Sequence, residues 1–76
     1  MSWRERIEVN PKVLVGKPVV KGTRISVELV LGMIAAGVSE PEILGSYPSL
    51  EQEDLRACVA YAADIVGSER VYPLSA

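Results

Sequence analysis

The sequence predicts a mostly α-helical domain with a small N-terminal β-hairpin, in which three helices form a helix-turn-helix-like unit of the winged or homeodomain-like class. Before position 26 the apolar residues are largely β-branched and stand in short runs between glycines and prolines; after it they recur with the period of about 3.6 that is typical of helices. The 76 residues have the length of one domain. We expect short strands over 4–25, three helices over 26–66 and a short tail over 67–76.

The N-terminal third is predicted to consist of short extended pieces. We expect a strand over Ile7–Val9, followed by a turn at Asn10 and Pro11. The runs 13–15 and 19–20 are rich in valine and are consistent with further short strands or a loose hairpin. Pro18 has no amide hydrogen to give to a neighbouring strand, so any strand there is expected at the edge of a sheet.

The first two helices carry recognisable start and stop signals. Ser26 is predicted to cap the first helix, and Gly37 to end it in a left-handed conformation. Gly32 lies inside this helix and costs ~1 kcal/mol relative to alanine, which suggests close packing against another backbone. Ser39 and Glu42 resemble a capping box at the start of a short second helix that ends near position 45. The first helix presents one apolar stripe: Val27, Val30, Leu31, Ile34 and Ala35.

The third helix is expected to be apolar around most of its circumference. Tyr47 and Pro48 form a break, and the helix is predicted to begin at Ser49 or Glu51 and to run to about Val66. Such a helix must be covered on more than one side, and 49% apolar residues are many for a domain with so small a core. We therefore expect a homodimer or partner interface along the third helix. Its predicted residues are Ala57, Val59, Ala60, Tyr61 and Ala63.

Charge is divided unevenly along the chain. Residues 1–24 carry six basic and two acidic side chains, whereas residues 25–76 carry two basic and eight acidic ones. A basic N-terminal part favours an anionic partner, although the two halves could equally neutralise each other within a dimer. Glycine amides and basic side chains between 16 and 24 suit a phosphate group. The predicted nucleic-acid-binding residues are Lys17, Lys21, Thr23 and Arg24.

Two alternatives compete with a phosphate site in this segment. Gly22 and Thr23 are also typical of a plain tight turn, and Arg24 is placed to pair with Glu28 four residues later. The spacing does not match a P-loop, so nucleotide hydrolysis is not expected. The third helix is a poor reader of DNA, because carboxylates crowd its start and DNA affinity comes chiefly from basic side chains.

The residue inventory excludes several classes of active site. The chain has no histidine and one cysteine, which excludes Ser-His-Asp and Cys-His catalysis, histidine-ligated zinc and an internal disulfide. Cys58 stands among apolar residues and is expected to be a buried, inert thiol, and Trp3 to be a packing anchor. No apolar run is long enough to cross a membrane. We expect a cytoplasmic protein with no enzyme activity, metal or cofactor.

The order of short motifs resembles the bacterial and archaeal family called domain of unknown function 433. The resemblance covers roughly residues 4–64. Its most specific parts are a Gly-Lys-Pro-x-x-x-Gly-Thr-Arg segment, a Tyr-Pro-x-Leu segment and an Ala-Tyr-Ala segment, which here are residues 16–24, 47–50 and 60–62. A threonine common at the start of the family's last helix is Glu51 in this chain.

The resemblance implies a small β-hairpin joined to a helix-turn-helix-like three-helix unit, usually in a homodimer. It further implies an antitoxin of the VapB kind, which neutralises a PIN-like ribonuclease toxin and binds its own operator DNA. An alternative is a stand-alone DNA-binding transcriptional repressor without a toxin. A third class, an enzyme, is disfavoured because no pair of carboxylates accompanies a pocket-forming segment.

Overall fold

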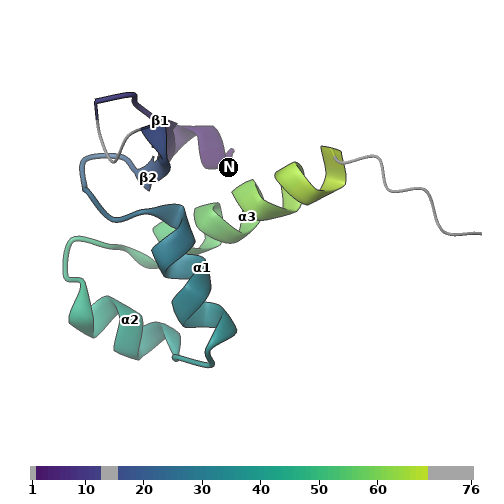
Figure 1. Cartoon of the computed structure of the whole chain (residues 1–76). Coiled ribbons are helices and arrows are strands. Elements are labelled where there is room, and N and C mark those ends of the chain that lie inside the picture. The colour runs from purple at the N-terminus through teal and green to yellow at the C-terminus, as the bar shows by residue number, and fades with distance from the viewer. Residues whose placement is uncertain (1, 13–15, 69–76) are drawn as a thin grey trace, which may run out of the picture.

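The computed structural model describes residues 2–12 and 16–68. A short 3-10 helix, η1 (Trp3–Glu5), precedes two strands, β1 (Ile7–Val9) and β2 (Pro18–Val20), and three helices follow. These are α1 (Val27–Ala35), α2 (Glu40–Ser46) and α3 (Gln52–Ser68). The predicted fold class is confirmed: an N-terminal hairpin stands on a three-helix unit (Figure 1). Among the described residues, no helix combines the length and the apolar character needed to cross a membrane.

The hairpin is a two-stranded antiparallel sheet. Ile7 is paired with Val20, and Val9 is paired with Pro18 at the far end of the ladder. An isolated bridge between Val19 and Ser26 ties the sheet to the start of α1. The strands predicted over 7–9 and 19–20 are thus confirmed, and Pro18 occupies the first position of an edge strand, where a missing amide is tolerated. The strand predicted over 13–15 lies outside the described residues.

Local capping chemistry explains where α1 and α2 begin and end. The Ser26 hydroxyl accepts a hydrogen bond from the Leu29 amide at 3.0 Å, and the Ser39 hydroxyl accepts one from the Glu42 amide at 3.3 Å. Gly37 adopts a φ of +86° just after α1, as predicted. The expectation for Gly32 was wrong: a Cβ atom there would meet nothing within 4 Å, so this glycine does not permit a close backbone contact.

The long helix α3 extends further than the sequence predicts. It continues through Gly67 to Ser68, past the expected end at Val66. One isolated glycine costs a helix only ~1 kcal/mol, which does not stop it without a capping partner. The C-terminal half of α3 projects away from the rest of the described chain (Figure 1). This projection leaves apolar side chains of α3 without neighbours.

The core lies where the hairpin and all three helices meet. Ile43 supplies a fully buried side chain from α2, and Val30 does so from α1. Ile34 and Ala35, which belong to the predicted apolar stripe of α1, are exposed in the last turn of that helix. The buried cluster comprises Ile7, Val20, Val27, Val30, Ile43, Leu50, Leu55, Ala57 and Cys58.

Candidate functional site

The predicted nucleic-acid-binding residues lie in and beside the turn that follows β2. Thr23 is occupied structurally: its hydroxyl donates to the Val20 carbonyl at 2.8 Å and accepts from the Ile25 amide at 3.0 Å. Gly22 adopts a φ of +78°, so the turn needs a glycine at this position. The tight-turn alternative therefore describes Gly22 and Thr23 better than a phosphate site does.

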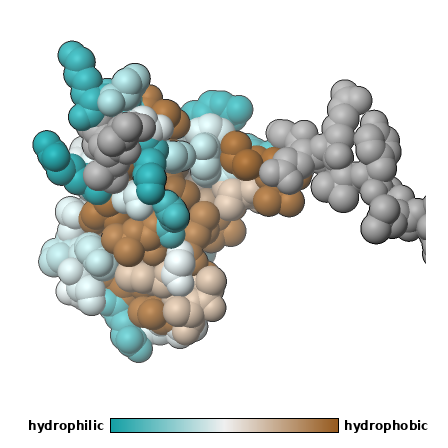
Figure 2. Space-filling model, viewed as in Figure 1, coloured by the Kyte–Doolittle hydropathy of each residue, from teal (hydrophilic) through white to brown (hydrophobic). Residues whose placement is uncertain are grey.

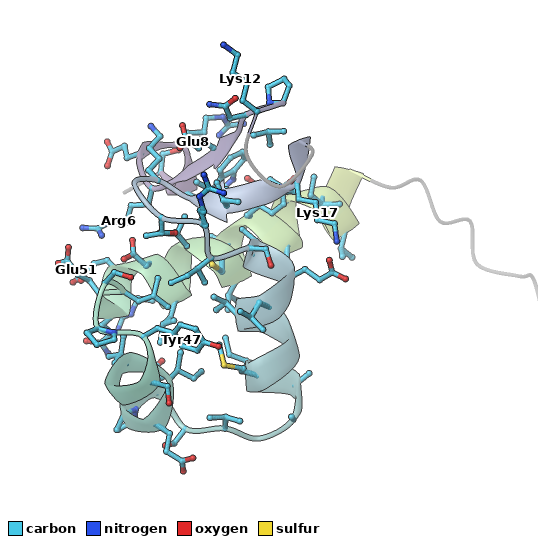
Figure 3. All side chains as sticks on the ribbon, turned by 60° about the vertical axis from the view of Figure 1, so that its left-hand side comes forward. Arg6, Glu8, Lys12, Lys17, Tyr47 and Glu51 are labelled. Carbon is cyan, nitrogen blue, oxygen red and sulfur yellow. The ribbon has the colours of Figure 1, made fainter. Side chains whose placement is uncertain are left out.

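The basic side chains near this turn are not brought together into one cluster. Lys17 donates to the Glu28 carboxylate at 3.0 Å, with both side chains exposed. The alternative pairing of Arg24 with Glu28 is therefore wrong, because Lys17, just before β2, pairs with that carboxylate instead. Arg24 is exposed and makes no ion pair with any residue that the structure describes. Figure 3 shows Lys17 and Lys12 at separate places on the hairpin.

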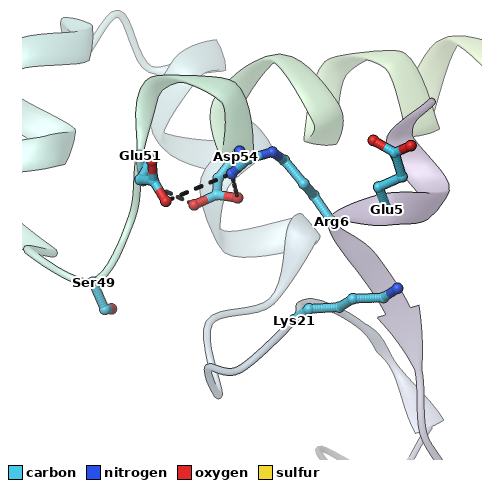
Figure 4. Close-up of a pocket in the computed structure, with 6 residues that line it drawn as sticks. All are labelled: Glu5, Arg6, Lys21, Ser49, Glu51 and Asp54. Carbon is cyan, nitrogen blue, oxygen red and sulfur yellow. Dashed lines mark hydrogen bonds and ion pairs between the residues drawn. The ribbon is translucent and has the colours of Figure 1, made fainter. Parts of the chain in front are cut away.

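Lys21 lines a polar pocket of about 310 Å³ between the hairpin and the start of α3 (Figure 4). Arg6 lies at its centre and donates to the Asp54 carboxylate at 2.9 Å, with Glu51 at 3.8 Å. The hydrogen bond to Asp54 raises the pKa of the Arg6 guanidinium, which stays charged. The pocket is lined by Glu5, Arg6, Lys21, Ser49, Glu51 and Asp54.

Asp54 connects the hairpin to the helical unit. It is buried, with 5% of its surface exposed, and its second oxygen accepts a hydrogen bond from the Glu51 amide at 2.8 Å. The carboxylate thereby caps the first turn of α3 while it holds Arg6 of the hairpin. From the sequence, Asp54 is one of several carboxylates at the start of the third helix, and this contact was not predicted. Three of the residues that line the pocket, Arg6, Glu51 and Asp54, are therefore engaged in contacts that hold the hairpin on the helical unit.

An apolar groove of about 390 Å³ lies between α3, the end of α1 and the start of α2. Val59 is 48% exposed and Ile34 is 37% exposed, both high values for large aliphatic side chains. One acidic and one basic residue, Glu40 and Arg56, stand among its lining residues. The apolar lining consists of Ile34, Val38, Leu55, Val59, Ala60 and Ala63, and we call this set the apolar groove. Figure 2 shows broad apolar surface on one face of the molecule and on the projecting part of α3.

The groove contains three of the five residues predicted for an interface. Val59, Ala60 and Ala63 are exposed on α3 and line it. The prediction for Ala57 is not compatible with the structure, since this residue is only 3% exposed and belongs to the core. Ala57 shares a helix face with Asp54 and Tyr61, three and four residues away, and that face packs against the N-terminal segment.

Tyr61 is partly buried by the N-terminal 3-10 helix. Its ring meets the Trp3 ring edge-on, with centroids 4.8 Å apart and planes at 89°. The Trp3 indole nitrogen donates to the Asp64 carboxylate, and the Arg4 guanidinium lies 4.5 Å from the Trp3 ring centroid. Trp3 is thus a packing anchor, as expected. It fixes α3 at the point where the helix leaves the body of the domain.

Cys58 occupies the interior as predicted and is fully buried. Loss of hydration raises the pKa of its thiol to about 11, and the negative charge of Asp54 acts in the same direction. Burial of the thiol and its raised pKa both disfavour the thiolate, which is the form that acts as a nucleophile or metal ligand. Within residues 2–12 and 16–68, no three carboxylate, thiol or imidazole side chains gather in a way that would hold a metal ion.

Comparison with known proteins decides the family. The family model described as "Protein of unknown function (DUF433)" matches residues 7–62. The chain belongs to the DUF433 family. The match includes the hairpin, the turn after β2, and α3 as far as Ala62, so the fold elements that build both candidate surfaces are DUF433 elements.

One curated relative and one solved structure show how the DUF433 unit occurs elsewhere. Uncharacterized protein y4eO of Sinorhizobium fredii is 39% identical over 71 residues, which are 91% of this chain and 32% of the relative. The crystal structure of a DUF433 member protein from Anabaena variabilis ATCC 29413 superposes on this chain with a TM-score of 0.76 at 31% sequence identity. The superposition covers 82% of this chain and 61% of the Anabaena chain. The chain thus spans about a third of the length of the curated relative.

Proposed function

We propose that this DUF433 chain is a non-catalytic, homodimeric binding module of the antitoxin type, which neutralises a PIN-like ribonuclease toxin. The observation that carries the proposal is an exposed acidic surface beside an exposed apolar groove. Between Val38 and Leu55 the sequence has five carboxylates and no basic residue. Only Asp54 of these five is buried against another part of the chain. The four exposed ones are Glu40, Glu42, Glu51 and Glu53, and we call them the acidic surface.

The acidic surface supports a partner of opposite charge. A ribonuclease must attract an RNA backbone, so the surface around its active site is basic. Carboxylates that cover such a surface attract the partner over a distance of about one Debye length, ~8 Å at physiological salt, and compete with RNA for the same site. The negative surface extends over two helices, because Glu42 is exposed on α2 and Glu53 is exposed on α3.

Dimerisation is supported by the apolar groove. Large aliphatic side chains with exposures of 37% and 48% line a concave surface, which is typical of a surface that meets another protein. A domain of this size has a small core and gains stability when a partner covers such a surface. The two surfaces adjoin at Glu40, which also lines the groove: in this proposal the groove joins two copies, and Glu42, Glu51 and Glu53 of the acidic surface meet the toxin.

Co-expression with the product of the neighbouring gene, which the proposal expects to be a PIN-like ribonuclease, tests the proposal. The ribonuclease is expected to co-purify with the chain and to lose activity on a fluorescent RNA substrate. The double substitution Glu42→Lys with Glu53→Lys is expected to weaken inhibition at least tenfold. The matched control Glu8→Lys with Glu28→Lys makes the same change in charge on β1 and α1 and is expected to inhibit normally. Equal loss in both variants, or no inhibition by the unmodified chain, would contradict the proposal.

Operator binding is a second candidate, and it includes the alternative of a stand-alone repressor. It is supported by Arg24, an exposed side chain without an ion pair in the described part of the chain, and by its neighbour Lys21. Arg24→Glu with Lys21→Glu is expected to abolish operator binding in a gel-shift assay. Binding by the unmodified chain should fall steeply with salt, by roughly one unit of log–log slope per phosphate contact. Operator affinity unchanged by the double substitution would exclude this surface as the DNA site.

A further inference from the structure

The apolar groove and the projecting end of α3 have complementary shapes within one chain. The groove is an open concave surface, whereas Val66 on the projecting end is 66% exposed. In the described part of the chain no other large hydrophobic side chain is as exposed as Val66. Figure 1 shows that this end of α3 extends clear of the hairpin and of the other helices. Val66 cannot reach the groove of its own chain, because it projects from the same rigid helix that forms one side of that groove. It can fill the groove only of a second copy.

Helix geometry places both features on the same face of α3. Val59 and Val66 are seven residues apart, close to two turns at 3.6 residues per turn, and Ala63 lies between them on the same side. If two copies of α3 run antiparallel and cross between Ala62 and Ala63, Val66 of each copy lies opposite Val59 of the other. Val66 of one copy then enters the groove of its partner beside Ile34 and Val38.

Charge favours the same antiparallel arrangement. Arg56 stands at the groove and is exposed, while α3 has no basic residue in its own last turn. In this register Arg56 lies beside the C-terminal end of the partner's α3, where the helix dipole favours a cation. The two arginines of the dimer are about 13 residues apart along the helix axis, ~20 Å at 1.5 Å per residue, so they do not repel at physiological salt.

We propose that two copies of this chain dock through antiparallel α3 helices, with Val66 of each copy filling the apolar groove of the other and Arg56 capping the other's helix end. The groove is incomplete without that side chain from the second copy. This inference rests on the homodimer of the proposed function and adds its orientation, its register and the residue that fills the groove.

Disulfide trapping tests the orientation. In a Cys58→Ala background, Val59→Cys with Val66→Cys should give a covalent dimer under mild oxidation, because the two positions face each other across the interface. Each single cysteine variant should stay uncrosslinked, because like positions lie about 10 Å apart along the axis in this register. Efficient crosslinking by Val59→Cys alone would indicate parallel helices or an antiparallel crossing at Val59, and either would overturn the register, though not the dimer. A chain that sediments as a monomer before oxidation would instead contradict the dimer itself.

A pair of matched substitutions tests whether Val66 is the residue that fills the groove. Val66→Glu places a charge in the partner's groove and should raise the dimer dissociation constant at least tenfold in sedimentation equilibrium. Val9→Glu is the control, because Val9 is similarly exposed at 58% but lies on β1 of the hairpin, paired with Pro18. Both variants should keep the helical circular dichroism spectrum, since neither side chain is buried. An unchanged dissociation constant for Val66→Glu, or an equal rise for both variants, would overturn the assignment of Val66.

Discussion

Replacement of Asp54 should weaken the attachment of the hairpin to the helical unit. The resulting loss of stability measures how much this attachment contributes. In Asp54→Ala the hydrogen bonds from Arg6 at 2.9 Å and from the Glu51 amide at 2.8 Å are both lost. A hydrogen bond to a charged group contributes ~1.5–3 kcal/mol, and loss of a helix cap costs ~1 kcal/mol. Alanine recovers about 0.5 kcal/mol through its higher helix propensity.

The loss of unfolding free energy in Asp54→Ala is expected near the lower end of these values, because Arg6 is partly exposed. The Arg6 side chain keeps 28% of its surface exposed, so it regains water when the carboxylate is removed. We therefore expect Asp54→Ala to lose about 2–3 kcal/mol of unfolding free energy, which is less than the loss from a fully buried pair. For a domain of this size the melting temperature should fall by roughly 10–20 °C.

Thermal and urea unfolding, both monitored by circular dichroism, measure this loss of unfolding free energy and the fall in melting temperature. The control is Glu53→Ala, which removes the same charge from the same helical turn at an exposed position and should cost less than about 0.5 kcal/mol. Both variants are compared at one protein concentration, because the proposed dimer would make the measured stability depend on concentration. Equal losses in the two variants would refute the reasoning that Asp54 acts through specific contacts rather than through charge alone.

Three further predictions concern the glycines of α1 and its end, the thiol of Cys58 and the indole of Trp3. Gly32→Ala should stabilise the chain by about 0.5–1 kcal/mol in urea unfolding because its Cβ meets open space, whereas Gly37→Ala should destabilise it because φ is +86° there; a stabilising Gly37→Ala would be inconsistent with that turn. Because the pKa of Cys58 is raised from its usual 9.0 to about 11, the thiol ionises first in the unfolded chain, so stability should fall between about pH 9 and pH 11. A pH series in which Cys58→Ala shows the same fall would rule the thiol out as its cause. Trp3→Ala should speed amide hydrogen exchange in the turn of α3 around Tyr61 and spare α1; unchanged exchange there would mean that the indole does not hold the helix.

Local signals in the sequence predicted most of the secondary structure. Ser26, Ser39 and Gly37 act on the backbone within a few residues, and each caps or ends a helix as its local chemistry predicts. The end of α3 was placed too early because a lone glycine was given more weight than the helix around it. Gly32 was misjudged because its exposure depends on what packs around α1, which local sequence does not contain.

Contacts between distant residues could not be predicted in the same way. Arg6 and Asp54 are 48 positions apart, and Trp3 and Asp64 are 61 positions apart. Their pairing depends on how the hairpin lies on α3. The exposed face of α3 was predicted because its apolar circumference exceeds what a small core can cover, and Val59 lies on that face. Ile34, which lines the groove from α1, was predicted only as part of an apolar stripe and not as an interface residue.

Sedimentation velocity of the unmodified chain over a dilution series tests most directly whether this protein acts by docking onto other molecules. The groove and the projecting helix predict a species of twice the chain's mass at micromolar concentration, which dissociates on dilution and is lost in Val66→Glu. A monomer that keeps its single-chain mass at every concentration, alone and with the proposed ribonuclease partner, would contradict the account.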